Sequence, residues 1–247
     1  IGIEVLQPDV NESFESFAVI RGDDGRERIR FGLQAIKNVG SVCAEEIVKE
    51  RERGGKFKTL EDFVERVQTK DLNKKSVEAL AKVGGLDQLG EREQILESID
   101  AIVRHGKQAS TIAESHTQSL FGSMPLPKPK INLIKATPAS KEQTLAWEKE
   151  LLGLYITGHP VTDYRHYFAK TTTPLADLEK KENESRVRIG GLITAVRRVI
   201  TKSGNPMFFI GLEDLTGRTE VLVFGKTAEQ TEGFWKEDDI VIIDARI

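Results

Sequence analysis

The sequence has almost no cysteine, no long apolar run and no excess of positive charge. Cys43 is the single cysteine in 247 residues, so no disulfide can form within the chain and we expect a reducing compartment, the cytoplasm. No stretch approaches the roughly 18 apolar residues of a membrane span, and no basic and then apolar leader opens the chain. The net charge is −3, so any contact with nucleic acid must come from local patches.

Two further absences set expectations. The four histidines are scattered along the chain, so we expect no metal site. The first residue is not Met, and we therefore expect the chain to be a piece of a longer polypeptide.

The chain is organised around residues 33–48, where two apolar-periodic segments meet across Asn38-Val39-Gly40. Apolar residues three and four apart on either side predict a helix, a tight hairpin and a second helix, with Cys43 on the core side of the second. We expect Gly40 to adopt a positive φ, Asn38 to tolerate the left-handed region, and Ser41 to cap the second helix.

Such a hairpin turns backbone N–H groups outward at the positive end of a helix, which binds an anion such as a nucleic-acid phosphate. The alternative is an ordinary pair of antiparallel helices closed by Gly40. The candidate DNA-binding residues of this hairpin are Lys37, Asn38, Val39, Gly40 and Ser41.

A second hairpin of similar spacing is predicted after a connecting helix at residues 59–67. A helix that starts from Asn73 runs into Val83-Gly84-Gly85-Leu86, and an amphipathic helix follows to Val103. Two hairpins can grip neighbouring phosphates of a duplex, so Gly84 and Gly85 are candidate DNA-binding residues; the alternative is a plain helical bundle. We predict a tandem helix-hairpin-helix domain over residues 31–104, preceded by an extended lead-in at 1–30.

Residues 105–139 lose the helical period and fill with Gly, Ser, Thr, Pro and Lys, which predicts a linker. Within it, Gln118, Leu120 and Phe121 form a short apolar motif in polar surroundings. Leu120 and Phe121 either anchor the linker or fill a pocket on a partner. Ser140 then opens a helix in a connecting segment over residues 140–184.

From residue 185 the period switches to two, which predicts strands near residues 187–200, 207–213, 219–224 and 240–247. A helical or irregular segment before the last strand gives the early topology of a five-stranded OB barrel; the fifth strand is missing, so we expect a truncated chain. The fold class is therefore α+β and multi-domain. Phe208 and Phe209 point to opposite faces, one in the core and one able to stack a base, and we take Phe208 as the stacking ring. The basic candidates are Arg197, Arg198 and Lys202; the alternative is a merely solvated basic hairpin.

Several long phrases occur in an order that resembles the C-terminal region of the bacterial DNA polymerase III alpha subunit, a family of replicative DNA polymerases. The resemblance covers essentially the whole chain, and Asn38 is ordinary in that family. The phrases are Val5-Leu-Gln-Pro-Asp-Val-Asn-Glu-Ser13, Ile29-Arg-Phe-Gly-Leu-Gln-Ala-Ile-Lys-Asn-Val-Gly40, Phe57-Lys-Thr-Leu-Glu-Asp-Phe63, the residue 80–90 hairpin, and Glu150-Leu-Leu-Gly-Leu-Tyr-Ile-Thr-Gly-His-Pro160.

The resemblance implies that residues 1–30 end a fingers domain, that the hairpins hold primer-template duplex, and that the OB domain binds single-stranded template. The family's catalytic carboxylates and Mg²⁺ ions lie in an upstream palm domain that nothing here matches, so we expect no catalytic residue and no cofactor in this chain. The polymerase activity, a nucleotidyl transfer, would belong to the parent protein.

The linker motif falls where the family carries its sliding-clamp peptide, commonly Gln, two variable residues, Leu or Met, then Phe. Leu120 and Phe121 match its apolar end, while Gln118 sits one position too close and Thr117 occupies the usual Gln place. The implied partners are the sliding clamp and other replicase subunits. The alternative function is a structural scaffold for protein contacts in a replication or repair assembly.

Overall fold

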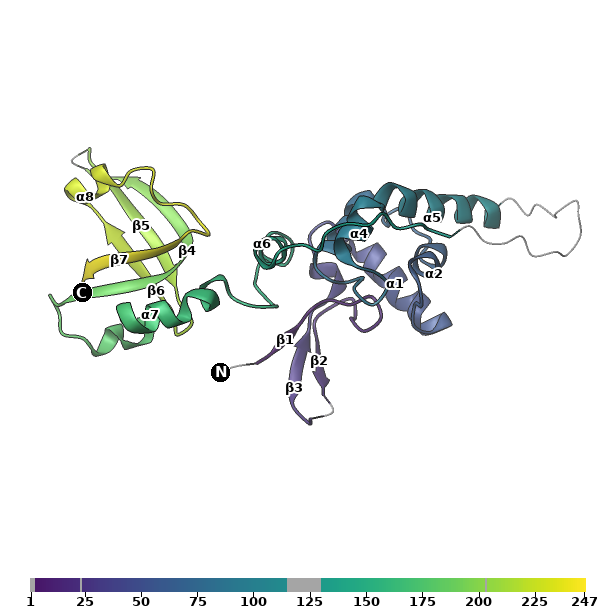
Figure 1. Ribbon diagram of the computed structural model, residues 1–247, viewed down its shortest axis with the longest axis horizontal. Helices are drawn as coiled ribbons and strands as arrows, with labels where there is room; N and C mark the ends of the chain where they lie inside the picture. Colours follow the sequence, from purple (N-terminus) through teal and green to yellow (C-terminus); the bar gives the residue numbers. More distant parts are fainter. Residues whose placement is uncertain (1–2, 23, 115–129, 203) are drawn as a thin grey trace, which may run out of the picture. The chain divides into compact units, whose positions relative to one another are not determined.

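The computed structural model describes residues 3–22, 24–114, 130–202 and 204–247. The chain divides into two compact units, Ile1–Thr157 and Gly158–Ile247. The first is mainly helical and the second is built on an antiparallel sheet (Figure 1), which confirms the α+β prediction.

The predicted extended lead-in forms a small sheet at the start of the first unit. Strands β1 (Val5–Leu6), β2 (Ala18–Arg21) and β3 (Glu27–Arg30) pair in the order β1-β3-β2. The β1–β3 pair is parallel and the β2–β3 pair antiparallel. The hairpin of β2 and β3 projects from the helices of the same unit (Figure 1).

The helices of the first unit begin at the capping residues that the sequence provides. Thr59, Asn73 and Ser140 each accept a hydrogen bond from a backbone N–H in the first turn of the helix that follows. The elements are the 3-10 helix η1 (Leu33–Ala35) and the helices α1 (Ser41–Gly54), α2 (Leu60–Arg66), α3 (Lys74–Lys82), α4 (Arg92–Glu97), α5 (Ile99–Glu114) and α6 (Lys141–Leu152).

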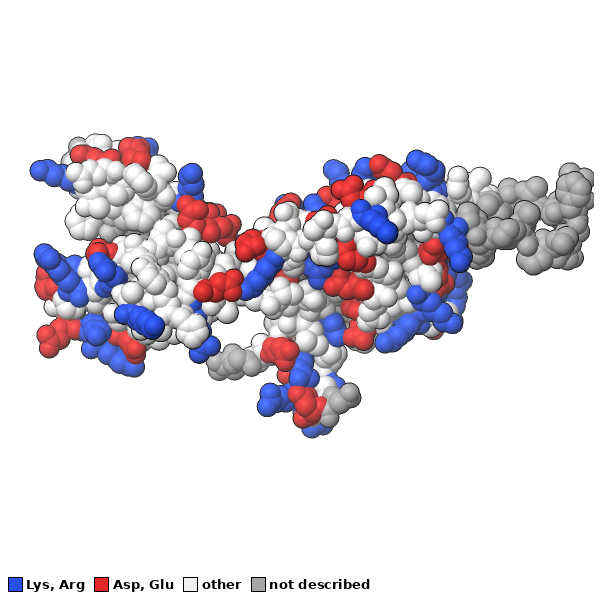
Figure 2. Space-filling model, in the orientation of Figure 1, with Lys and Arg blue, Asp and Glu red and all other residues white. Residues whose placement is uncertain are grey.

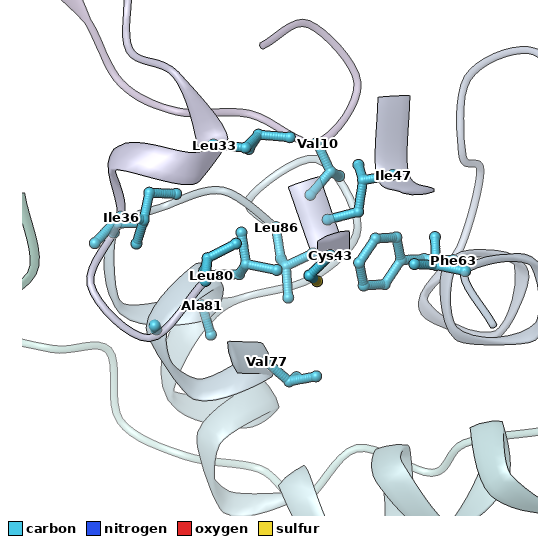
Figure 3. Close-up of a cluster of buried hydrophobic side chains, with 14 of the residues drawn as sticks. Val10, Leu33, Ile36, Cys43, Ile47, Phe63, Val77, Leu80, Ala81 and Leu86 are labelled. Carbon is cyan, nitrogen blue, oxygen red and sulfur yellow. The ribbon is translucent and has the colours of Figure 1, made fainter. Parts of the chain in front are cut away.

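These helices enclose one hydrophobic core (Figure 3). Leu33 and Ile36 from the segment before α1 meet Cys43 and Ile47 of α1, and residues from α2, α3 and the following turn complete the cluster. Cys43 is fully buried, as predicted, and burial raises the pKa of its thiol to about 12. The core therefore fixes the hairpin segment against the rest of the unit.

Two predictions for the first unit were wrong, namely the helix before Asn38 and the start of the linker. The segment before Asn38 forms only the 3-10 turn η1, because the Lys37 N–H donates to the Leu151 carbonyl (2.9 Å) instead of continuing a helix. The predicted linker starts too early, since α5 continues through residues 105–114. The chain then returns to the helices after residue 130: Ile131 N–H donates to the Glu61 carboxylate (2.8 Å) and Ile134 N–H to the Ser98 hydroxyl (2.8 Å).

The second unit opens with η2 (Pro160–Tyr164), α7 (Arg165–Thr171) and η3 (Leu175–Lys180). Its sheet comprises β4 (Arg186–Ile200), β5 (Pro206–Glu213), β6 (Arg218–Val223) and β7 (Ile240–Arg246), with α8 (Gly225–Gln230) before β7. The sheet is antiparallel, curled, and ordered β6-β5-β4-β7 (Figure 1). The strands lie where the period-two pattern predicts them, which confirms the OB-type sheet.

Candidate nucleic-acid interface

The hairpin between η1 and α1 is built by one left-handed residue and one extended glycine. Asn38 has a φ of 71°, which confirms the prediction for this residue. Gly40 has a φ of −72° and a ψ of 159°, so the predicted positive φ was wrong. Gly40 itself is the residue before the helix, and Ser41 is the first helical residue. Ser41 therefore does not cap α1, and no side chain does.

The start of α1 presents backbone N–H groups at the surface. Gly40, Ser41 and Val42 are exposed, and within the described residues their N–H groups have no hydrogen-bond partner in the protein. The first turn of α1 carries no acidic residue. Because the aligned peptide dipoles place positive potential at this end of the helix, the turn is suited to an anion.

Val39 and Lys37 were both predicted to contact DNA, but Val39 is buried and Lys37 has an exposed side chain. Val39 is buried in the core and its N–H donates to the Ile36 carbonyl (3.0 Å), so this residue anchors the turn and does not face a ligand. The Lys37 backbone is tied to Leu151, while its side chain is exposed. Lys37, Asn38, Gly40 and Ser41 thus share the outer surface of the hairpin.

Gly40 is a glycine that the fold itself does not require. A Cβ placed on Gly40 would have no protein atom within 4 Å, and its φ is one that any residue adopts. Six other glycines would likewise leave a Cβ in open space, but all six have a positive φ: Gly25, Gly55, Gly153, Gly204, Gly225 and Gly233. The open space lies beside the free N–H groups of α1, where an anion would approach the backbone closely.

The second predicted hairpin has a different structure. Gly84 has a φ of 82° and donates its N–H to the Ala81 carbonyl (3.1 Å), and Gly85 donates to the Leu80 carbonyl (2.8 Å). These two bonds close the C-terminus of α3, and both glycines are buried. Gly84 and Gly85 therefore have no N–H group free for a phosphate, and their assignment to DNA binding is corrected to a helix-ending role.

Residues 5–13, the first of the phrases that carry the family resemblance, contact this second turn. The Val10 N–H donates to the Gly85 carbonyl (3.0 Å). The Asn11 side chain donates to the Phe57 carbonyl (3.0 Å) and accepts from the Phe57 N–H (2.7 Å). The Asn11 side chain thus pairs with both backbone groups of Phe57, as a neighbouring strand would, and links the lead-in to the loop before α2. A buried polar side chain of this kind leaves no periodic signal in the sequence.

In the second unit, the ring that is free to stack on a base is that of Phe209 and not that of Phe208. The two rings do point to opposite faces of β5, as predicted, but Phe208 is 4% exposed and belongs to the core. Phe209 is partly exposed on the other face, and the guanidinium of Arg197 lies 4.1 Å from its ring centroid. Leu222 is paired with Phe209 across the strands and is 47% exposed. Arg197, Phe209 and Leu222 therefore form a mixed aromatic and basic surface, called here the sheet platform.

The other basic candidates of this sheet lie apart from the sheet platform. Arg198 shares the core face with Phe208 and pairs with Glu232 (2.7 Å), so its charge is largely neutralised. Lys202 is exposed, and no ion pair is formed by its side chain in the part of the chain that the structure describes. Gln118, Leu120 and Phe121 lie outside the described residues.

Charges of both signs are interspersed over the face of the helices shown in Figure 2. No helix among the described residues is long and apolar enough to cross a membrane. Within the same residues, no three His, Cys, Asp or Glu side chains gather as a metal site would need.

Comparison with known proteins assigns both units. A family model described as a helix-hairpin-helix motif matches residues 2–96, and one described as an OB-fold nucleic acid binding domain matches residues 187–247. The DNA polymerase III subunit alpha of Thermus aquaticus is 37% identical over 251 residues, covering 100% of this chain and 20% of that protein.

Proteins of the same name from Aquifex aeolicus and Borreliella burgdorferi are 36% and 33% identical, covering 98% and 100% of this chain. The chain spans about a fifth of the length of these relatives: 19% and 22% respectively. Along its length, the chain belongs to the DNA polymerase III alpha-subunit family and corresponds to a region that carries a helix-hairpin-helix motif and an OB-fold nucleic-acid-binding domain.

Proposed function

We propose that this region holds primer-template DNA for a longer replicative polymerase, with the start of α1 gripping a phosphate of the duplex. The observation that carries the proposal is Gly40, a glycine with an ordinary φ and open space beside three unpartnered N–H groups. A phosphate in that space would accept hydrogen bonds from Gly40, Ser41 and Val42. Such a contact reads no base, which suits a protein that must follow any sequence.

Only the hairpin before α1 binds a phosphate in this proposal. The turn at Gly84 and Gly85 supports that hairpin and does not contact DNA. The Gly84–Gly85 turn is occupied by its own helix and by Val10, so it braces the unit that presents α1. Lys37 adds a cation next to the exposed N–H groups. Since the chain carries a net charge of −3, affinity depends on this local arrangement.

The sheet platform is the proposed contact for single-stranded template. Phe209 offers a ring to a base, and Arg197 offers a planar cation that can stack or pair with a phosphate. OB folds bind single strands through stacking and a basic groove, with a contribution of about 1–3 kcal/mol for each stacked base.

The test is the affinity of a labelled primer-template for the wild-type chain and for Gly40→Val, measured by fluorescence anisotropy across a salt series. Valine suits the extended backbone of Gly40 but fills the space where the phosphate would lie. We expect binding to weaken about tenfold or more, because a hydrogen bond to a charged group contributes about 1.5–3 kcal/mol. The matched control is Ser41→Ala, which removes a hydroxyl that caps nothing and keeps the N–H group.

Salt dependence separates the proposal from the scaffold alternative. Phosphate binding predicts that the logarithm of the binding constant falls with the logarithm of salt concentration by about 0.9 for each phosphate neutralised. Lys37→Gln should reduce that slope by about one such step. Duplex affinity that is insensitive to salt, or unchanged by Gly40→Val, would reject the phosphate grip and favour protein contacts.

We further propose that Leu120 and Phe121 tether the chain to a sliding clamp in the cytoplasm, alongside other replicase subunits. The support is the apolar pair of the sequence motif, which stands in a Pro-rich and Ser-rich segment between α5 and α6. The same family resemblance assigns Mg²⁺ and catalysis to the palm of the longer protein, so this region would contribute position and not chemistry.

A further inference from the structure

The segment before the sheet carries a second aromatic surface in the unit that contains the sheet platform. Tyr164 and Tyr167 are 48% and 56% exposed. They flank Phe168, which is buried: the Tyr164 and Phe168 centroids lie 6.1 Å apart with nearly parallel planes, and those of Tyr167 and Phe168 lie 6.4 Å apart. The two exposed rings are thus supported by a buried one.

Phe168 is in turn seated against the sheet at a glycine. A Cβ on Gly190 of β4 would lie 3.0 Å from a carbon of the Phe168 ring, so the ring occupies the space that a side chain would take. Close packing of this kind fixes α7 on the sheet and holds the tyrosine rings in place. A rigid ring loses little conformational entropy when a base stacks on it.

Cations lie beside the two tyrosines. Lys170 is three residues after Tyr167 in α7, which places the two side chains on neighbouring positions of the helix surface. Lys170 is exposed and forms no ion pair within the described residues. Arg188 of β4 is held by Asp244 through two hydrogen bonds (2.7 and 2.9 Å). Lys170 is therefore a cation available to a ligand.

The tyrosine surface and the sheet platform lie on the same face of β4. Val187 and Ile189 point into the core, so Arg188 and Gly190 point outward. Arg198 is paired with the core residue Phe208, so Arg197 also points outward, beyond the irregularity between Ile193 and Ala195. From Gly190 to Arg197 the strand spans seven residue steps, which extend at most about 24 Å at roughly 3.4 Å per residue.

We propose that Tyr164, Tyr167 and Lys170 form a second stacking site for single-stranded DNA, which extends the path of the strand bound at the sheet platform. The inference rests on the proposed single-strand function of the second unit. The ligand chemistry follows from the groups present: flat rings stack on bases without reading their edges, and the lysine neutralises a phosphate. Single strands occupy about 4–16 nucleotides on an OB fold, so a long strand can reach both surfaces and a short one cannot.

The experiment compares labelled dT16 and dT4 on the 247-residue chain by fluorescence anisotropy. Tyr164→Ala/Tyr167→Ala should weaken dT16 binding at least fivefold and change dT4 binding by less than twofold, because dT4 keeps the sheet platform. The matched control is Tyr164→Phe/Tyr167→Phe, which keeps both rings and should bind dT16 as the wild type does. Lys170→Gln touches neither ring contact and should lower the salt slope for dT16 by about 0.7.

The outcomes separate this inference from the proposed function. If the wild-type chain binds dT16 and Phe209→Ala weakens it, while the tyrosine pair and Lys170→Gln have no effect, the second stacking site is rejected and the sheet platform stands. If the wild-type chain binds neither oligonucleotide, the proposed single-strand function fails and the inference fails with it. If Tyr164→Ala/Tyr167→Ala lowers the melting temperature substantially, the salt dependence of dT16 binding to Lys170→Gln is the deciding measurement. A slope lowered by about 0.7 supports the second stacking site, and an unchanged slope rejects it.

Discussion

Two glycines of the helical unit occupy opposite kinds of position. Gly84 has a φ of 82°, and a Cβ on it would lie 2.3 Å from a guanidinium nitrogen of Arg92. That guanidinium is held by two hydrogen bonds to Asp87 (2.9 and 2.7 Å). At Gly40 the φ is ordinary and the space is open. The fold therefore requires the first glycine and tolerates replacement of the second.

Replacement of each glycine by alanine should separate stability from binding. Gly84→Ala is expected to lower the free energy of unfolding by about 1–2 kcal/mol, because alanine is strained in the left-handed region and Arg92 must move. Gly40→Ala should change it by less than about 1 kcal/mol, since a lost preference for glycine before a helix offsets a less flexible unfolded chain. Urea denaturation followed by circular dichroism measures both. Equal losses in the two variants would contradict the assignment of Gly84 as the structural glycine.

The sequence could predict a glycine turn at each place but not which role each glycine has. Asn38 takes the left-handed conformation that was expected of Gly40, which frees Gly40 to be extended. The role of Gly84 depends on Arg92 and on Val10, which lies more than seventy residues earlier in the chain. Long-range partners of this kind are absent from local spacing, so a Gly-Gly pair looks the same whether its N–H groups are free or used.

At the scale of elements, the strands were predictable and the inner face of the sheet was not. Strict alternation places Phe208 and Phe209 on opposite faces in any strand. The core side is set by what covers it, and here Leu175 of η3 and Ala228 of α8 pack on the Phe208 side. The prediction of a helix before Asn38 was wrong for a similar reason, because the Lys37 N–H donates to the carbonyl of Leu151 in the distant helix α6.

The two phenylalanines should therefore respond oppositely to truncation. Phe208→Ala removes a buried ring and is expected to cost about 3–5 kcal/mol of stability. Phe209→Ala removes a partly exposed ring that contacts Arg197, so unfolding should change little while single-strand affinity falls at least fivefold. Thermal unfolding and dT16 anisotropy on the same samples give both readings. If Phe208→Ala is as stable as the wild type but binds dT16 more weakly, then Phe208 and not Phe209 is the stacking ring.

At the scale of the whole chain, the proposed contacts to DNA and to a protein partner lie in different segments. The helical unit offers backbone N–H groups, the sheet offers rings with cations, and the apolar pair Leu120 and Phe121 lies in the sequence between α5 and α6. Linked weak sites raise the effective concentration of each other, so a tether can strengthen DNA binding without a new DNA contact. The strengthening depends on the tether and should vanish when its apolar pair is removed.

Leu120→Ala/Phe121→Ala is expected to weaken binding to a bacterial sliding clamp at least tenfold, because a few buried apolar anchors dominate short peptide contacts. Gln118→Ala is the control within the motif and should have a smaller effect, since this glutamine is one position nearer to Leu120 than the family pattern places it. Surface plasmon resonance on immobilised clamp measures both variants. Affinity for a primer-template without the clamp should be the same in all three chains, whereas affinity for a clamp-loaded primer-template should fall only in the double variant. If the double variant retains clamp binding, the linker pair is an internal anchor and the clamp must contact another part of the polymerase.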